Sequence, residues 1–223
     1  MILAAGLGTR LRPLTDTRPK ALVELKGRTL LEITLSRLRE FGIHEVIVNV
    51  HHFADMIVDY LKSHDNFGMR IEISREDVLL DTGGGLKKAA WFFEGSTDPF
   101  ILHNVDVLSA IDLHRMVNFH VENASLATLA VKDRKTSRYL LFDDQHQLRG
   151  RSATPDPRMQ SLAFSGIHVI SPGLLLKIAE EGVFSIITSY LNLAARGEKI
   201  LAFRADEYDW RDLGKPEDLK QAE

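Results

Sequence analysis

The chain contains no cysteine among its 223 residues. This absence excludes disulfide bonds, zinc sites built on thiolates and enzymes that use a thiol nucleophile. A continuous apolar run of about 18 residues is also absent, and the short apolar start Met1–Ala5 carries no basic residue. We therefore predict neither a membrane span nor a signal peptide, and we expect a cytoplasmic protein without a membrane partner.

The sequence also lacks an excess of positive charge, since its formal net charge is −3. Nucleic-acid binding would need a local basic patch instead, and none stands out along the chain, so we expect no nucleic-acid partner. Apolar residues make up 44% of the chain, which is ample for one core. From this length and composition we predict a single domain over residues 1–223. Hexapeptide repeats, which would build an additional β-helix, are absent from the sequence. We expect a monomer or a small homo-oligomer.

The most informative stretch is a turn with two glycines near the amino terminus, AGLGTRLRPLT over residues 5–15. It follows the apolar residues Met1–Leu3, which favour a strand, so the turn lies where open α/β sheets bind ligands. Gly6 and Gly8 can adopt positive φ values and let backbone N–H groups approach a phosphate. The stretch therefore predicts a polyphosphate site, with positive charge supplied by Arg10, Arg12 and Lys20.

Helical periods and apolar runs alternate through the first half of the chain. Repeated crossovers of this kind predict an α/β fold with a doubly wound, mostly parallel central sheet covered by helices. The helices are expected over residues 30–41, 53–61 and 86–93, and the strands over residues 1–3, 46–50, 69–73 and 100–103.

The pattern changes after Asp112, where strands become more frequent. We expect residues 1–111 to contain most of the polyphosphate site and residues 112–223 to add further strands beside it. The added strands are predicted over residues 126–131, 139–142 and 163–169, with helices over 171–178 and 186–195 and a loop over 152–160.

One acidic residue stands at the end of a predicted strand. Asp106 follows the apolar run Phe100–Leu102, so we expect its carboxylate at the carboxyl edge of the sheet. Carboxylate oxygens are the ligands that Mg²⁺ prefers, and the residue is thus a candidate metal ligand. The alternative is a turn or cap residue.

Two familiar phosphate loops do not fit the glycine turn, because Leu11 stands at the third glycine position of G-x-G-x-x-G and no P-loop lysine is present. The stretch instead resembles the G-x-G-x-R-L-x-P-L-T…P-K motif of nucleoside-diphosphate-sugar pyrophosphorylases, the sugar-1-phosphate nucleotidyltransferases. The resemblance implies a Rossmann-like fold and Mg²⁺-dependent transfer of a nucleotidyl group from a nucleoside triphosphate to a sugar 1-phosphate, releasing pyrophosphate. It makes Arg10 and Lys20 catalytic cations and assigns nucleotide binding to Ala5, Gly6, Gly8, Thr9 and Arg10.

The same resemblance implies the metal ligands. Asp106 matches the aspartate of the family's G-D step, with Val105 in place of the glycine. Asp212 matches the aspartate of a W-x-D-x-G-T-P segment, with Lys215 in place of the threonine. Asp212 is thereby the second magnesium ligand, and the alternative is a cap for a helix that begins at Pro216.

Three consecutive glycines, Gly83–Gly85, allow the main chain to lie against a flat ring and to present N–H groups to its edge. In the family this segment borders the nucleobase, which assigns Thr82, Gly83 and Gly84 to nucleotide binding, although a helix-entry turn is the alternative. The D/E-T-G-G-G form resembles the uridylyltransferase subgroup that uses UTP and N-acetylmuramate 1-phosphate, a role in cell-wall nucleotide-sugar synthesis. Sugar binding is assigned by the same resemblance to Asn104, Ser165 and Gly166.

One family feature, an E-K-P step whose lysine holds the sugar phosphate, is missing. Four cations could replace it, and the sequence does not choose among Lys132, Arg134, Lys135 and Arg138. Base and sugar also stay open, with mannose-1-phosphate guanylyl transfer and phosphocholine cytidylyl transfer as competing reactions. A nucleotide-binding regulatory subunit without turnover is the alternative outside the enzymes. The histidines need no catalytic role and are interpreted as structural.

Overall fold

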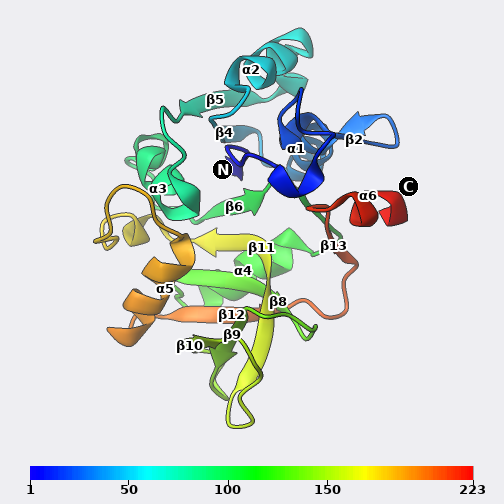
Figure 1. The fold of residues 1–223 in the computed structure, drawn as a ribbon. Coiled ribbons are helices and arrows are strands. Elements are labelled where there is room, and N and C mark those ends of the chain that lie inside the picture. The colour runs from blue at the N-terminus through cyan, green and yellow to red at the C-terminus, as the bar shows by residue number, and fades with distance from the viewer. Residues whose placement is uncertain (223) are drawn as a thin grey trace.

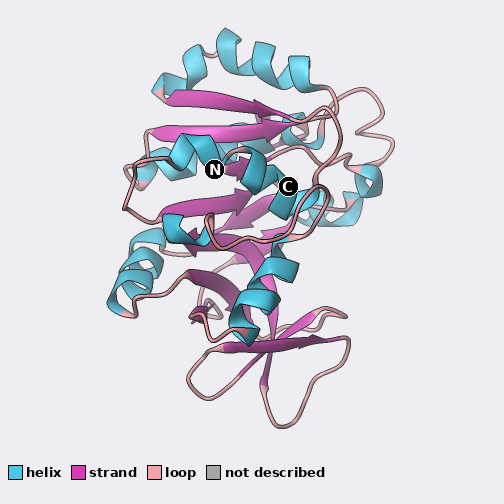
Figure 2. Cartoon of the chain, turned by 90° about the vertical axis from the view of Figure 1, so that its left-hand side faces the viewer, coloured by secondary structure: helices cyan, strands magenta, loops and turns pink. Residues whose placement is uncertain are grey.

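A computed structural model describes residues 1–222, which fold around one nine-stranded sheet (Figures 1 and 2). The strand order is β10-β9-β11-β6-β1-β4-β5, and β8 and β12 continue the sheet from the other edge of β11. The strands are β1 (Ile2–Leu3), β4 (Glu45–Val50), β5 (Arg70–Arg75), β6 (Phe100–Asn104), β8 (Ala127–Lys132), β9 (Tyr139–Phe142), β10 (Leu148–Ser152), β11 (Gln160–Ile170) and β12 (Ile200–Arg204).

The predicted sheet class is confirmed. Neighbours β5, β4, β1 and β6 are parallel, and β12 is parallel to β8. Because β11 is antiparallel to β6, β8 and β9, and β10 is antiparallel to β9, only β10 and β11 run against the other strands. The parallel half brings the carboxyl ends of β1, β4 and β6 to one edge, where ligands are expected.

Each face of the sheet carries its own hydrophobic core, as the alternation along β4 shows. Val46, Val48 and Val50 belong to one core, while Ile47 belongs to the other. Helices α1 (Leu30–Glu40), α2 (Ala54–Ser63), α4 (Leu113–Glu122) and α6 (Pro216–Ala222) cover the first core. The second is covered by α3 (Asp81–Lys88) and α5 (Ile186–Ala195). No helix within residues 1–222 is long and apolar enough to cross a bilayer.

Strand β11 joins the two halves of the sheet. Its residues 160–163 pair with β9, and its residues 167–170 pair with β6. The pairing with β8 is irregular between Phe164 and His168, where Gly166 adopts a φ of +78°. Nearby, β7 (Val107–Ser109) and β13 (Trp210–Asp212) form a separate two-stranded sheet, as do β2 (Glu24–Leu25) and β3 (Arg28–Thr29).

Two helix predictions are wrong. Instead of a helix over residues 86–93, α3 begins at Asp81 and ends at Lys88, so the three glycines lie inside it, and a 3₁₀ turn follows over Ala90–Phe93. Instead of a helix over residues 171–178, only Pro172–Leu174 form a 3₁₀ turn. Leu174 and Ile178 are buried in the second core, but Leu176 is 91% exposed and residues 175–177 form a turn.

Candidate active site

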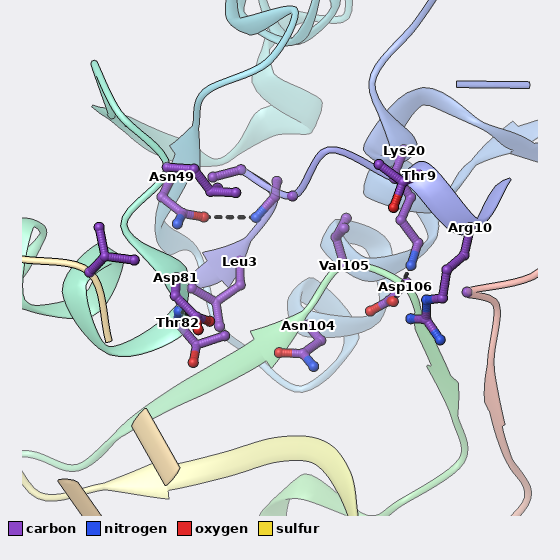
Figure 3. A pocket seen from close by; sticks show the side chains of 17 residues that line it. Leu3, Thr9, Arg10, Lys20, Asn49, Asp81, Thr82, Asn104, Val105 and Asp106 are labelled. Carbon is purple, nitrogen blue, oxygen red and sulfur yellow. Dashed lines mark hydrogen bonds and ion pairs between the residues drawn. The ribbon is translucent and has the colours of Figure 1, made fainter. Parts of the chain in front are cut away.

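A cavity of about 440 Å³ opens at the carboxyl ends of β1, β4 and β6 (Figure 3). It contains most of the residues predicted for the site, namely Ala5, Gly6, Gly8, Thr9, Arg10, Lys20, Thr82, Asn104 and Asp106. The remaining lining residues were not predicted as site residues: Leu3, Ala4, Asn49, Leu79, Asp81, Val105, Val183 and Gly214. Asp212, Gly83, Gly84, Ser165 and Gly166 are not among the lining residues.

The glycine turn is held in shape by its own contacts. Gly8 adopts a φ of +66°, and its carbonyl accepts hydrogen bonds from Thr15 Oγ1 at 2.8 Å and from the Leu11 amide at 2.8 Å. A Cβ atom at Gly8 would lie 2.9 Å from Thr15 Cγ2, so a larger residue would displace the turn. Gly6 does not adopt a positive φ and has open space around it, which leaves room for a ligand beside the backbone.

Charged side chains gather at one end of the cavity. The Lys20 ammonium group forms an ion pair with the Asp106 carboxylate, and the two side chains are only 12% and 17% exposed (Figure 3). The Arg10 side chain points to the same place (Figure 3). It also lies near Asp212, because a Cβ atom built at Gly214 would be 2.7 Å from Arg10 Nη2 and 2.6 Å from Asp212 Oδ1. The structure thus brings the guanidinium group of Arg10 and the carboxylate of Asp212 to the same point.

The backbone explains why the two aspartates are neighbours. Asp212 on β13 pairs with Val107 on β7, directly after Asp106. The Leu213 amide also donates a 2.8 Å hydrogen bond to the Asp106 carbonyl. The pairing of β7 with β13 therefore holds Asp212 next to Asp106, although more than a hundred residues separate them in the sequence.

The electrostatics of this pair favour a bound cation. Burial raises the pKa of Asp212, and the negative charge of Asp106 raises it further, while Lys20 and Arg10 oppose the shift. Asp212 Oδ1 is buried and has no hydrogen-bond partner among residues 1–222. Two adjacent carboxylates with an unsatisfied oxygen match the donors that a divalent ion such as Mg²⁺ takes from a protein.

The described residues contain no group of three or more His, Cys, Asp or Glu side chains placed to hold a metal ion. A metal bound by Asp106 and Asp212 would therefore complete its coordination with phosphate oxygens and water. This division of ligands is usual for Mg²⁺ in phosphoryl-transfer sites.

The opposite end of the cavity is more apolar. Leu3 lies there beside Asp81 and Thr82 at the start of α3 (Figure 3). Leu79 and Val183 also line the cavity, and they lie near each other because the Phe184 amide donates to the Leu80 carbonyl. The walls thus change from apolar to charged along the cavity. This gradient suits a ligand with a flat ring at one end and phosphates at the other.

The expected role of Gly83 and Gly84, which lie inside this helix, needs a correction. The N–H groups of Gly83 and Gly84 both donate to the carbonyl of Phe184, at 2.9 and 3.3 Å, so in this structure they are not presented to a base. A Cβ atom at Gly83 would lie 2.3 Å from the Phe184 ring, and one at Gly84 would lie 2.3 Å from the carbonyl oxygen of Gly182. The glycines therefore allow α3 to pack closely against residues 182–186.

A buried polar network that was not expected from the sequence lies beside the cavity, which Asn49 lines. The Glu76 carboxylate accepts hydrogen bonds from Asn49 Nδ2 at 2.7 Å and from the Leu80 amide at 2.9 Å. Asn49 Oδ1 in turn accepts a 2.7 Å bond from the Ala4 amide. The network ties β1, β4 and the segment before α3 together, and the only sign of it in the sequence was one asparagine within an apolar strand.

The predicted sugar-binding residues lie together. Asn104 lines the cavity, and a Cβ atom at Gly166 would lie 3.0 Å from its Nδ2 atom and 2.7 Å from Val107 Cγ2. Ser165 is fully buried, its hydroxyl has no partner among the described residues, and its carbonyl accepts a 2.7 Å bond from Trp210 Nε1. The segment containing Ser165 and Gly166 thus contacts the cavity through Asn104.

Comparisons with known proteins agree with this geometry. The family described as nucleotidyl transferase matches residues 1–223. An N-acetylmuramate alpha-1-phosphate uridylyltransferase of Caulobacter vibrioides is 35% identical, over 100% of this chain and 94% of that protein. A UTP–glucose-1-phosphate uridylyltransferase of Synechocystis sp. is 30% identical, over 100% of this chain and 61% of that protein. A mannose-1-phosphate guanylyltransferase catalytic subunit beta of Drosophila melanogaster is also 30% identical, over 98% and 60%.

Solved structures share the fold. HddC from Yersinia pseudotuberculosis complexed with GMP-PN superimposes with a TM-score of 0.80 at 23% identity, covering 99% of this chain and 96% of that one. A putative glucose-1-phosphate thymidylyltransferase from Bacillus anthracis gives a TM-score of 0.84 at 18% identity, covering 99% and 92%. The Rossmann-like architecture expected from the sequence is confirmed.

Proposed function

Since the chain belongs to the nucleotidyl transferase family, we propose that the cavity beyond β1, β4 and β6 is the active site of a sugar-1-phosphate nucleotidyltransferase. The convergence of Arg10, Lys20, Asp106 and Asp212 at one end of this cavity carries the proposal. Two cations and two carboxylates beside a glycine turn are what an enzyme needs to bring two phosphate esters together.

The substrates fit the gradient of the walls. The nucleobase lies at the apolar end, near Leu79, Thr82 and Val183, and the triphosphate follows the glycine turn towards Arg10 and Lys20. A sugar-phosphate oxygen attacks the α-phosphorus in line, a new P–O bond forms, and the bond to the β-phosphate breaks to release pyrophosphate. The attacking oxygen is already anionic, so the reaction requires no strong base.

The two cations have different tasks. The planar fork of Arg10 is suited to hold the β- and γ-phosphates through paired hydrogen bonds, and it neutralises the charge that grows on the leaving pyrophosphate. Lys20 is a point charge that stabilises the α-phosphate as charge spreads over its oxygens. Because both side chains line the same cavity, they act on neighbouring phosphates.

Members of this family generally use a divalent metal ion. We propose Mg²⁺, held by Asp106 and by Asp212, whose buried Oδ1 has no partner within residues 1–222. When bound, the ion supplies positive charge that lowers the repulsion between the two phosphate-bearing substrates.

The proposal is tested by measuring pyrophosphate release with each nucleoside triphosphate and a panel of sugar 1-phosphates in the presence of Mg²⁺. We expect Asp106→Asn to lower turnover at least about 100-fold, because a charge that stabilises the transition state is lost. Asp209→Asn is the matched control, since Asp209 is a nearby aspartate outside the cavity lining. Near-normal turnover by the Asp106 variant would remove that residue from the mechanism.

For the substrates we propose UTP and N-acetylmuramate 1-phosphate, supported by the D-T-G-G-G segment and the 35% identical uridylyltransferase. Guanylyl transfer to mannose 1-phosphate is the second candidate, favoured by the 30% identical guanylyltransferase. Thermal denaturation with each of the four triphosphates distinguishes them, since the ligand that binds the native state best raises the melting temperature most. An enzyme stabilised by GTP rather than UTP would refute the first choice.

The division of labour between the two halves of the chain is also a proposal. Residues 1–111 supply most of the nucleotide site, and residues 112–223 supply Ser165, Gly166 and Asp212 for the sugar-phosphate side. Val183 and Gly214 from the second half also line the cavity. The proposed division therefore concerns which substrate each half binds, and it does not separate two regions in space. The expected cytoplasmic location and oligomeric state stay predictions.

A further inference from the structure

Four cations at the end of β8 and just after it are candidates to bind the phosphate of the sugar 1-phosphate, which is the acceptor in the proposed reaction. Their surroundings in the structure distinguish one of them from the other three. Lys132 donates to the carbonyls of Ala205, Asp206 and Tyr208, which uses all three donors of its ammonium group. Lys135 and Arg138 are exposed, and neither side chain has a hydrogen-bond partner among residues 1–222. Only Arg134 is both partly buried and incompletely paired.

Arg134 is held in a fixed orientation. Its guanidinium carbon lies 4.3 Å from the centre of the Trp210 ring, and its Nη2 atom donates a 2.9 Å hydrogen bond to the Phe164 carbonyl. Trp210 is itself fixed by its bond to the Ser165 carbonyl. The arginine therefore stacks on one strand and bonds to another, and it needs little reorganisation to bind a ligand.

The hydrogen-bonding capacity of this guanidinium group is mostly unused. Nε is buried and has no partner in the described part of the chain, and Nη2 is the one atom of the group with a hydrogen bond there. An arginine carries five N–H donors in a planar fork that matches phosphate geometry. A partly buried cation with free donors is therefore ready for an anion.

Arg134 lies near Asp212, one of the two carboxylates of the proposed active site. Residues two apart on a strand face the same side, so Trp210, on which the arginine stacks, shares a face of β13 with Asp212. The charge of Asp212 acts on Arg134. The Phe164 carbonyl that it binds precedes Ser165 and Gly166, and Gly166 packs against the Asn104 side chain in the cavity wall.

We infer that Arg134 binds the phosphate of the incoming sugar 1-phosphate, beside Trp210 and the segment that contains Phe164, Ser165 and Gly166. This inference rests on the proposed function and names the residue that takes the place of the missing E-K-P lysine. Arg10 and Lys20 hold the nucleotide, and Arg134 holds the acceptor.

The test compares Arg134→Ala and Arg134→Lys with the control variants Lys135→Ala and Arg138→Ala. The acceptor is whichever of glucose, mannose or N-acetylmuramate 1-phosphate the unmodified enzyme turns over fastest. We expect Arg134→Ala to raise the KM for this acceptor about 10- to 100-fold, the scale of a lost charge-assisted hydrogen bond, and to leave the KM for the triphosphate within about threefold. Arg134→Lys should be intermediate, added guanidinium ion should partly restore Arg134→Ala, and both controls should be unaffected.

An unchanged acceptor KM in a folded Arg134→Ala enzyme would overturn the inference. Equal losses for acceptor and triphosphate would also overturn it, because they indicate a structural role. If Arg134→Ala does not fold, as judged by thermal denaturation, Arg134→Lys decides by the same comparison of KM values. Failure of the proposed function is seen separately, as a lack of turnover by the unmodified enzyme with every acceptor.

Discussion

Three buried histidines predict how the stability of this protein depends on pH. His103, His120 and His168 are at most 2% exposed. Burial lowers the pKa of His103 and His120 to about 4 and that of His168 to about 3. His120 lies between the hydroxyls of Thr128 and Ser171, both at 2.9 Å, so its neutral ring is fully hydrogen bonded.

The sign follows from proton binding. In the unfolded chain a histidine has a pKa near 6.5, so between pH 6.5 and the folded values the unfolded state binds more protons. The contribution of the three neutral histidines to the free energy of unfolding is therefore fully present above pH 6.5, and it is lost as the pH falls from 6.5 towards 4. Between pH 7.5 and 5.5 the three groups together lower the free energy of unfolding by about 4 kcal/mol, which is more than about 1 kcal/mol each. For a chain of this size that corresponds to a fall of about 8 to 16 °C in Tm.

Thermal denaturation followed by circular dichroism at pH 7.5, 6.5 and 5.5, at constant ionic strength, measures this fall. His120→Gln keeps a polar side chain between Thr128 and Ser171 but does not titrate, so the loss of stability between pH 7.5 and 5.5 should shrink by about 1 kcal/mol. His52→Gln, on the surface, is the matched control. A Tm that stays constant between pH 7.5 and 5.5 would refute the reasoning. So would a slope unaltered by His120→Gln.

Two further predictions concern Gly83 and Glu76, which support the cavity without lining it. Gly83→Ala should destabilise the fold by about 1 to 3 kcal/mol, because the new Cβ would lie 2.3 Å from the Phe184 ring. Urea unfolding should show recovery in the double variant with Phe184→Leu and little change in Gly173→Ala, where the space is open, and the idea fails if the two alanine variants behave alike. Glu76→Ala should lower stability by about 2 to 4 kcal/mol, since two buried donors, one of them on Asn49, lose their acceptor. It should also raise the KM for the triphosphate, and an unchanged KM would show that the network does not position the site.

The parts of the site that the sequence predicts well are local. The glycine turn and Asp106 each follow an apolar strand directly, so their place at the sheet edge follows from the strand itself. Asp212 is different, because only the pairing of β13 with β7 brings it beside Asp106. The sequence shows no such pairing, and the residue was found through its resemblance to a family motif.

Tertiary contacts explain the elements that were missed or misread. Glycines disfavour helices in isolation, yet Gly83 and Gly84 are helical because the Phe184 carbonyl binds their N–H groups and the neighbouring chain leaves no room for side chains. Helix α4 was not predicted, since its buried face includes a polar residue, His120, whose partners come from distant segments. Strands β10 and β12 were missed as well. Polar residues interrupt β10.

The bonds from Gly83 and Gly84 to Phe184 also bear on how the protein can be divided. Helix α3, beside the cavity, is held by hydrogen bonds to the Phe184 carbonyl, about a hundred residues later in the chain. Its Leu86 is buried in the hydrophobic core that α5 also covers. A fragment ending near residue 111 would therefore leave that helix without its support and with bare apolar surface. The cavity that we propose as the nucleotide site is therefore built by residues from both halves of the chain.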